Sequence, residues 1–82
     1  MRFLLYSRSY CHLCDDMLAA LRSLPAASGA TIEVIDVDAD EALVRAYDEL
    51  VPVLMGIDGD GAGHELCHYF LDPQAVNAFL AG

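Results

Sequence analysis

Along the first half of the chain, the spacing of hydrophobic residues alternates between a pattern typical of strands and one typical of a helix. Arg2–Tyr6 is a short apolar run and Thr31–Val37 is rich in β-branched residues, so both are predicted to be strands. Between them, from His12 onward, apolar residues recur at three- and four-residue spacing: Leu13, Met17, Leu21 and Leu24. This spacing predicts a helix with one buried face, which Pro25 ends.

A second helix is predicted in the middle of the chain. Asp38, followed three residues later by Glu41, resembles a capping pair at the start of a helix. The residues that would share one side of this helix are apolar or aromatic: Leu43, Ala46, Tyr47 and Leu50. Pro52 ends the segment.

The last third of the chain is predicted to form a hairpin and a final helix. Val53–Ile57 and Glu65–Phe70 are predicted to be strands, joined by the glycine-rich turn Asp58–Gly63. Asp72 followed by Pro73 is typical of an N-cap and a first-turn proline. The expected fold is α/β, in the order β-α-β-α-β-β-α, with a four-stranded mixed sheet flanked by helices in a single domain over residues 1–82.

Charge narrows the classes of function. Thirteen acidic residues face four arginines and no lysine, which gives a net charge of −9. This balance argues against binding to nucleic acid or to an anionic membrane surface. The apolar run near the N-terminus is too short for a signal peptide or a membrane span. We therefore expect a cytoplasmic protein that acts as a monomer.

The candidate chemistry is carried by cysteines. Cys11 and Cys14 form a C-x-x-C motif where the first predicted strand gives way to the first predicted helix, and Cys67 stands alone. Unpaired N–H groups at a helix start stabilise a thiolate, and cysteines so placed have pKa values of about 3.5–7.5. Cys11 is predicted to be the attacking sulfur, and Cys14 resolves the mixed disulfide.

The residues around the motif are predicted to tune it and to bind substrate. Arg8 and a protonated His12 favour the thiolate, whereas the carboxylates of Asp15 and Asp16 oppose it. Tyr10, immediately before the first cysteine, is predicted to line a substrate groove.

Val51 and Pro52 form the second candidate motif. The third strand is expected to run antiparallel to the first, so it begins at the same end of the sheet as Cys11. A proline that opens a strand is structurally ordinary. The functional interpretation is a cis peptide bond facing the C-x-x-C, with the N–H and C=O of Val51 turned outward to pair with an extended thiol substrate.

With these two motifs in this element order, the chain resembles the glutaredoxin branch of the thioredoxin superfamily. It is similar to small bacterial glutaredoxin-like proteins in which acidic residues directly follow the C-x-x-C, here in the stretch Tyr10–Asp16. The resemblance implies a thioredoxin-like fold and a redox dithiol, with Cys11 as nucleophile, Cys14 as resolving residue and Pro52 in cis.

The chain also departs from the glutaredoxin pattern. His12 stands where glutaredoxins usually have proline, and Arg8 is the nearest cation in place of a lysine before the first cysteine. Tyr69–Asp72 lacks the usual Gly-Gly pair, although Asp72 stands where an acidic residue would hold the γ-glutamyl end of glutathione.

The leading hypothesis is a thiol–disulfide oxidoreductase that acts on a protein disulfide or a low-molecular-weight thiol. It needs no bound cofactor, and glutathione is a candidate reductant. Two alternatives remain open. One is a zinc or iron–sulfur module built from Cys11 and Cys14 with Cys67 or a histidine. The other is a redox-inactive adaptor that binds a partner through the groove at Val51 and Pro52.

Overall fold

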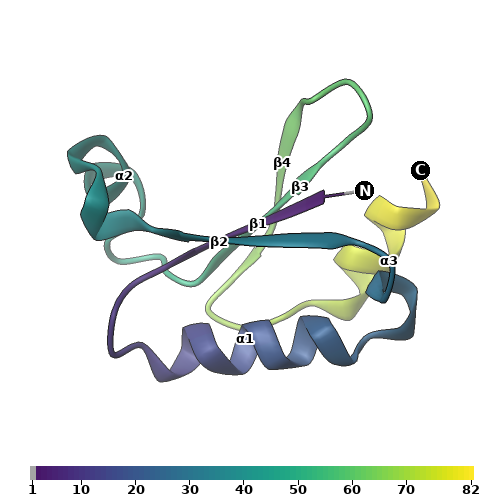
Figure 1. Cartoon of the computed structure of the whole chain (residues 1–82), viewed down its shortest axis with the longest axis horizontal. Coiled ribbons are helices and arrows are strands. Elements are labelled where there is room, and N and C mark those ends of the chain that lie inside the picture. Colours follow the sequence, from purple (N-terminus) through teal and green to yellow (C-terminus); the bar gives the residue numbers. More distant parts are fainter. Residues whose placement is uncertain (1) are drawn as a thin grey trace.

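The computed structural model describes residues 2–82 and contains four strands and three α-helices (Figure 1). The strands are β1 (Arg2–Ser7), β2 (Thr31–Asp36), β3 (Val53–Ile57) and β4 (Gly63–His68). The helices are α1 (His12–Ser23), α2 (Glu41–Tyr47) and α3 (Pro73–Ala81), with short 3₁₀ turns η1 (Pro25–Ala27) and η2 (Val37–Ala39). The predicted order β-α-β-α-β-β-α is confirmed.

The sheet is mixed, with the strand order β2-β1-β3-β4. β1 runs parallel to β2 and antiparallel to β3, and β3 runs antiparallel to β4. Tyr6, Val53 and His68 therefore lie in one row, at the end of β1, the start of β3 and the end of β4. We call this the cysteine end of the sheet, because α1 begins just beyond β1.

The core lies between one face of the sheet and the helices α1 and α3. The face presents Phe3, Leu5 and Leu54, all essentially inaccessible to solvent. The buried side of α1 meets them with Met17 and Leu21, as its apolar spacing predicts. Figure 1 shows α1 and α3 on this side of the sheet and α2 on the other.

The opposite face of the sheet is covered less completely. α2 has no fully buried residue, and it meets the sheet through Tyr47, whose ring stacks on Tyr6 with centroids 4.7 Å apart. Helices therefore flank the sheet on both sides, but the packing that stabilises the fold is concentrated on the α1 and α3 side. Among residues 2–82, no helix has both the length and the apolar character needed to cross a membrane.

The predicted capping role of Asp38 is wrong. Asp40 is the N-cap of α2, with an extended backbone (φ −141°, ψ 119°) and a side chain that accepts the N–H of Ala42 at 2.9 Å. Asp38 lies inside η2, which Asp36 caps by accepting the Asp38 N–H at 3.0 Å. Each of the three alternating aspartates is a suitable N-cap residue. The backbone conformation decides that Asp36 and Asp40 act as caps and that Asp38 does not.

The fourth strand begins and ends two residues earlier than predicted. β4 covers Gly63–His68, whereas the sequence predicts Glu65–Phe70. It ends at His68 because Tyr69 has a φ of 63°, which turns the chain out of the sheet. The N–H of Phe70 then donates to the His68 carbonyl at 2.7 Å. β2 also ends one residue before the predicted limit, because Val37 begins η2.

Gly56 in β3 marks a close approach between the sheet and α3. A Cβ atom at this position would lie 2.7 Å from the ring of Phe79. We expect Gly56→Ala to lower the free energy of unfolding by about 1–3 kcal/mol, because the Phe79 ring or α3 must shift. Urea unfolding measures this change. Gly59→Ala is the matched control, since no atom lies within 4 Å of its Cβ position; equal losses in the two variants would contradict the steric explanation.

Candidate redox site

Cys11 and Cys14 lie at the start of α1 and are joined by a disulfide, with Cα atoms 5.2 Å apart. Cys11 is the N-cap residue of α1, with φ −109° and ψ 103°. Its Sγ accepts the backbone N–H of Cys14 at 3.1 Å. A sulfur therefore takes the place that a Ser or Asp oxygen takes at an ordinary N-cap, where unpaired N–H groups favour negative charge.

The two sulfurs differ in their access to solvent. Cys14 is 3% exposed and packs within the first turn of α1, whereas Cys11 is half-buried. A disulfide or thiol from solution can therefore reach Cys11 much more readily than Cys14. This difference is what an attacking and a resolving cysteine require.

The loop from Val51 to β3 lies at the same end of the sheet. The Val51–Pro52 peptide bond is cis, and Pro52 is buried. The N–H of Val51 donates to the Tyr47 carbonyl at 3.1 Å, so the prediction that this N–H faces a substrate is wrong. The turn that closes α2 uses it instead. In the described chain, no backbone hydrogen bond outside the helices and strands ends on the Val51 carbonyl.

Arg8 lies in the loop between β1 and α1, where it is held by Asp38. Its Nε donates to Oδ2 at 3.1 Å and its Nη2 donates to Oδ1 at 2.8 Å. Both side chains are about 40% exposed, and the Asp38 carboxylate raises the pKa of Arg8. The pair joins the loop that precedes Cys11 to η2, so the guanidinium is already engaged by a carboxylate.

The other predicted site residues have different surroundings. Tyr10 is fully exposed, with a φ of 58°, and His12 is the exposed first residue of α1, so both flank Cys11 at the surface. Asp72 is the N-cap of α3, and its Oδ1 accepts the N–H groups of Gln74 and Ala75 at 3.0 and 3.3 Å. That carboxylate therefore has a clear structural task at α3.

Cys67 is a free, half-buried thiol in β4, on the face of the sheet that packs against α1 and α3. Burial raises the pKa of the Cys67 thiol, and the charges of Asp72 and Glu65 act in the same direction, although the Asp72 backbone N–H opposes them. The thiolate of Cys67 is thus disfavoured at neutral pH. Within residues 2–82, no three His, Cys, Asp or Glu side chains gather in an arrangement that could hold a metal ion.

For two residues beside this region, the sequence did not predict a role at the site. Asp38 was interpreted as a helix cap, and nothing local indicates a partner 30 residues earlier. Tyr69 donates its N–H to the Pro52 carbonyl at 2.9 Å and its hydroxyl to the Glu49 carbonyl at 2.7 Å. It thereby ties the end of β4 to the loop that carries Pro52.

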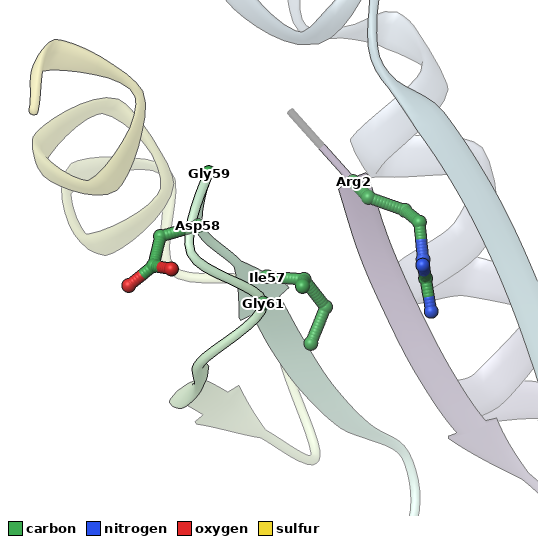
Figure 2. Close-up of a pocket in the computed structure, with 5 residues that line it drawn as sticks. All are labelled: Arg2, Ile57, Asp58, Gly59 and Gly61. Atoms are coloured by element: carbon green, nitrogen blue, oxygen red, sulfur yellow. The ribbon is translucent and has the colours of Figure 1, made fainter.

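A surface hollow of about 340 Å³ lies at the opposite end of the sheet (Figure 2). Arg2 lines one side, and the other is lined by Ile57 at the end of β3 with Asp58, Gly59 and Gly61 of the β3–β4 turn. It contains no cysteine, and Arg2 lies within 3.9 Å of the Glu33 carboxylate. The chemistry-bearing side chains are therefore on the exposed rim around Cys11, at the far end from this hollow.

A family model described as a glutaredoxin-like domain (DUF836) matches residues 2–81. The comparison with curated proteins found no match. The family model thus covers nearly the whole chain, both motifs included.

Three solved structures are similar to this chain. The chain is similar to protein Ne2328 from Nitrosomonas europaea, with 42% identity and a TM-score of 0.81 over 95% of this chain and 88% of that one. It is also similar to protein XcR50 from X. campestris, with 33% identity and a TM-score of 0.66 over 96% and 95% of the two chains. Mitochondrial thioredoxin 3 from Saccharomyces cerevisiae, in its oxidised form, shares the fold at 17% identity, with a TM-score of 0.65 over 98% and 76% of the chains. This protein therefore belongs to the glutaredoxin-like domain (DUF836) family.

Proposed function

We propose that this protein is a thiol–disulfide oxidoreductase in which Cys11 attacks the substrate and Cys14 resolves the intermediate. The observation that carries the proposal is the position of the Cys11 sulfur. It is the N-cap of α1, it accepts the Cys14 N–H at 3.1 Å, and it is the more exposed of two bonded cysteines. In the reduced protein, the same N–H groups and the helix dipole stabilise a Cys11 thiolate.

The reaction transfers two electrons from the dithiol to a substrate disulfide. The Cys11 thiolate attacks one substrate sulfur, so an S–S bond forms between them while the substrate S–S bond breaks and the first thiolate leaves. The Cys14 thiolate then attacks Cys11, which forms the disulfide seen in the structure and releases the second thiolate. The two protons lost by Cys11 and Cys14 end on the two released thiols.

The reverse of these steps, driven by a thiol reductant, regenerates the dithiol. We propose a low-molecular-weight thiol for this step, and a protein disulfide or a small disulfide as substrate. The thiols themselves supply the electrons, so the cycle requires no bound cofactor.

The neighbouring residues fit supporting roles in this proposal. The carbonyl of Val51, beside Pro52, can accept a hydrogen bond from the backbone of an extended substrate. Tyr10 offers an exposed aromatic surface next to Cys11, and a protonated His12 adds positive charge close to the thiolate. Asp72 and Arg8 contribute through the structures they hold, at the start of α3 and in the loop before Cys11.

A thiol count during one turnover tests the proposal. The protein is reduced with dithiothreitol, separated from the excess reductant and mixed with bis(2-hydroxyethyl) disulfide. An alkylating reagent then stops the reaction, and mass spectrometry measures the mass of the protein. We expect Cys11 and Cys14 to lose their thiols together while Cys67 keeps its own. A dithiol that stays reduced in excess disulfide, or three cysteines that react alike, would refute the proposal.

A further inference from the structure

We infer that Asp38 is a specificity-determining residue of this site: by holding Arg8 in a two-bond ion pair, it disfavours negatively charged disulfides and favours neutral or cationic ones. The inference rests on the proposed function and deepens it by naming the charge class of the substrate.

Arg8 is the cation that the fold places in the loop leading to Cys11. The chain has four arginines and no lysine. Arg2 begins β1, at the opposite end of the sheet, and Arg22 lies in the last turn of α1, far along the helix from its cysteines. Arg45 belongs to α2. An anionic substrate approaching along the loop before Cys11 therefore meets Arg8 as its nearest positive partner in that segment.

Asp38 occupies the guanidinium in the way that a substrate carboxylate would. Both of its oxygens accept from Arg8, at 2.8 and 3.1 Å, which is the paired geometry that makes arginine selective for carboxylates. Asp38 is also anchored in η2, because its own N–H donates to Asp36. An incoming anion must compete with a carboxylate that is part of the same molecule and therefore present at high effective concentration.

The surroundings of the pair are negative once Arg8 is neutralised. The carboxylates of Asp36 and Asp48 lie close enough to act on the Arg8 charge as well. Asp15 adds a further negative charge in the first turn of α1. A cationic substrate is attracted to such a surface and an anionic one is repelled, with a strength that salt reduces.

Apart from the exposed His12 and these carboxylates, the surface beside Cys11 is apolar. Tyr10 is fully exposed and Leu13 is 37% exposed, so both present apolar area next to the attacking sulfur. The substrate class that fits is a disulfide flanked by neutral or basic groups, such as an exposed segment of a basic protein. A dianionic disulfide lacks both the charge and the partner that this site requires.

Three small disulfides of similar size test the inference in the full chain. They are cystamine, which carries two ammonium groups, neutral bis(2-hydroxyethyl) disulfide, and dithiodiglycolate, which carries two carboxylates. Each reaction converts the protein dithiol and one disulfide into the protein disulfide and two small thiols. Each single-turnover rate constant is divided by the rate constant of dithiothreitol with the same disulfide, which removes differences in intrinsic reactivity. At low salt we expect the normalised rate constant for cystamine to be about ten times that for dithiodiglycolate. In 0.5 M salt we expect this ratio to approach one.

Variants separate the contribution of Asp38 from that of net charge. Asp38→Asn frees Arg8 and should reduce the ratio at least about threefold, whereas Arg8→Gln should increase it because an unpaired carboxylate remains. Asp60→Asn, in the remote β3–β4 turn, removes the same charge and should leave the ratio unchanged.

Three results would overturn the inference: a wild-type preference for dithiodiglycolate, equal effects of Asp38→Asn and Asp60→Asn, or a reduced ratio in Arg8→Gln. The Arg8→Gln variant and the salt series keep the test decisive even where Asp38→Asn does not fold. Failure of the wild type to reduce the neutral disulfide would instead refute the proposed function.

Discussion

Cys11→Ser is expected to lower the rate of disulfide reduction by at least about a thousandfold, because a hydroxyl cannot replace the attacking thiolate. Cys14→Ser has a different expected result. Its Cys11 still attacks, but nothing resolves the intermediate, so one substrate half remains bound to the protein as a mixed disulfide. The contrast follows from the exposure of the two sulfurs, since Cys14 is buried and only Cys11 is readily reached from solution.

Intact mass spectrometry after a single turnover measures both outcomes. With bis(2-hydroxyethyl) disulfide, the Cys14→Ser protein should gain the mass of one mercaptoethanol half, located on Cys11 by peptide mapping. Cys67→Ser is the matched control, because it removes a cysteine that lies in the core face of β4, and it should keep wild-type turnover. Full turnover in Cys11→Ser, or an adduct found on another residue, would reverse the assignment of the nucleophile.

Phe3→Ala is expected to lower the free energy of unfolding by about 3–5 kcal/mol. Phe3 is 0% exposed at the centre of the cluster between the sheet and α1 and α3, and its ring packs against Phe79 with centroids 5.7 Å apart. For a chain of 82 residues, whose total stability is about 4–12 kcal/mol, this loss removes about a quarter to all of the free energy of unfolding.

Urea unfolding followed by circular dichroism measures this loss. Phe70→Ala makes the same change at a side chain that is 69% exposed, so it should cost less than about 1 kcal/mol. Similar midpoints for the two variants would show that the face of the sheet carrying Phe3 is not the main source of stability.

The element order was predictable because each element has a local signal. The apolar spacing that begins at Leu13 specifies a helix wherever its buried face is covered, and Pro25 ends that helix whatever surrounds it. Asp72 and Pro73 likewise act on the first turn of α3 alone. The position of Cys11 at the start of a helix was predictable for the same reason, because the neighbouring sequence alone indicates where that helix begins.

Predictions that depended on a choice between equivalent local options were less successful. Asp36, Asp38 and Asp40 are chemically alike, and the assignment of the α2 cap required the backbone angles of each residue. The end of β4 depended on the positive φ of Tyr69. Tyrosine rarely adopts this conformation, so the sequence did not indicate it.

By itself, the sequence determined the order of the elements, the placement of a C-x-x-C at the opening of α1, and a surface dominated by negative charge. The tertiary structure decided which groups remain free to act. It joined Arg8 to Asp38, 30 residues away, and linked Tyr69 to Pro52. The physical reason is that helix periodicity, caps and prolines act over a few residues, whereas a long-range ion pair or hydrogen bond exists only after the sheet has aligned its strands.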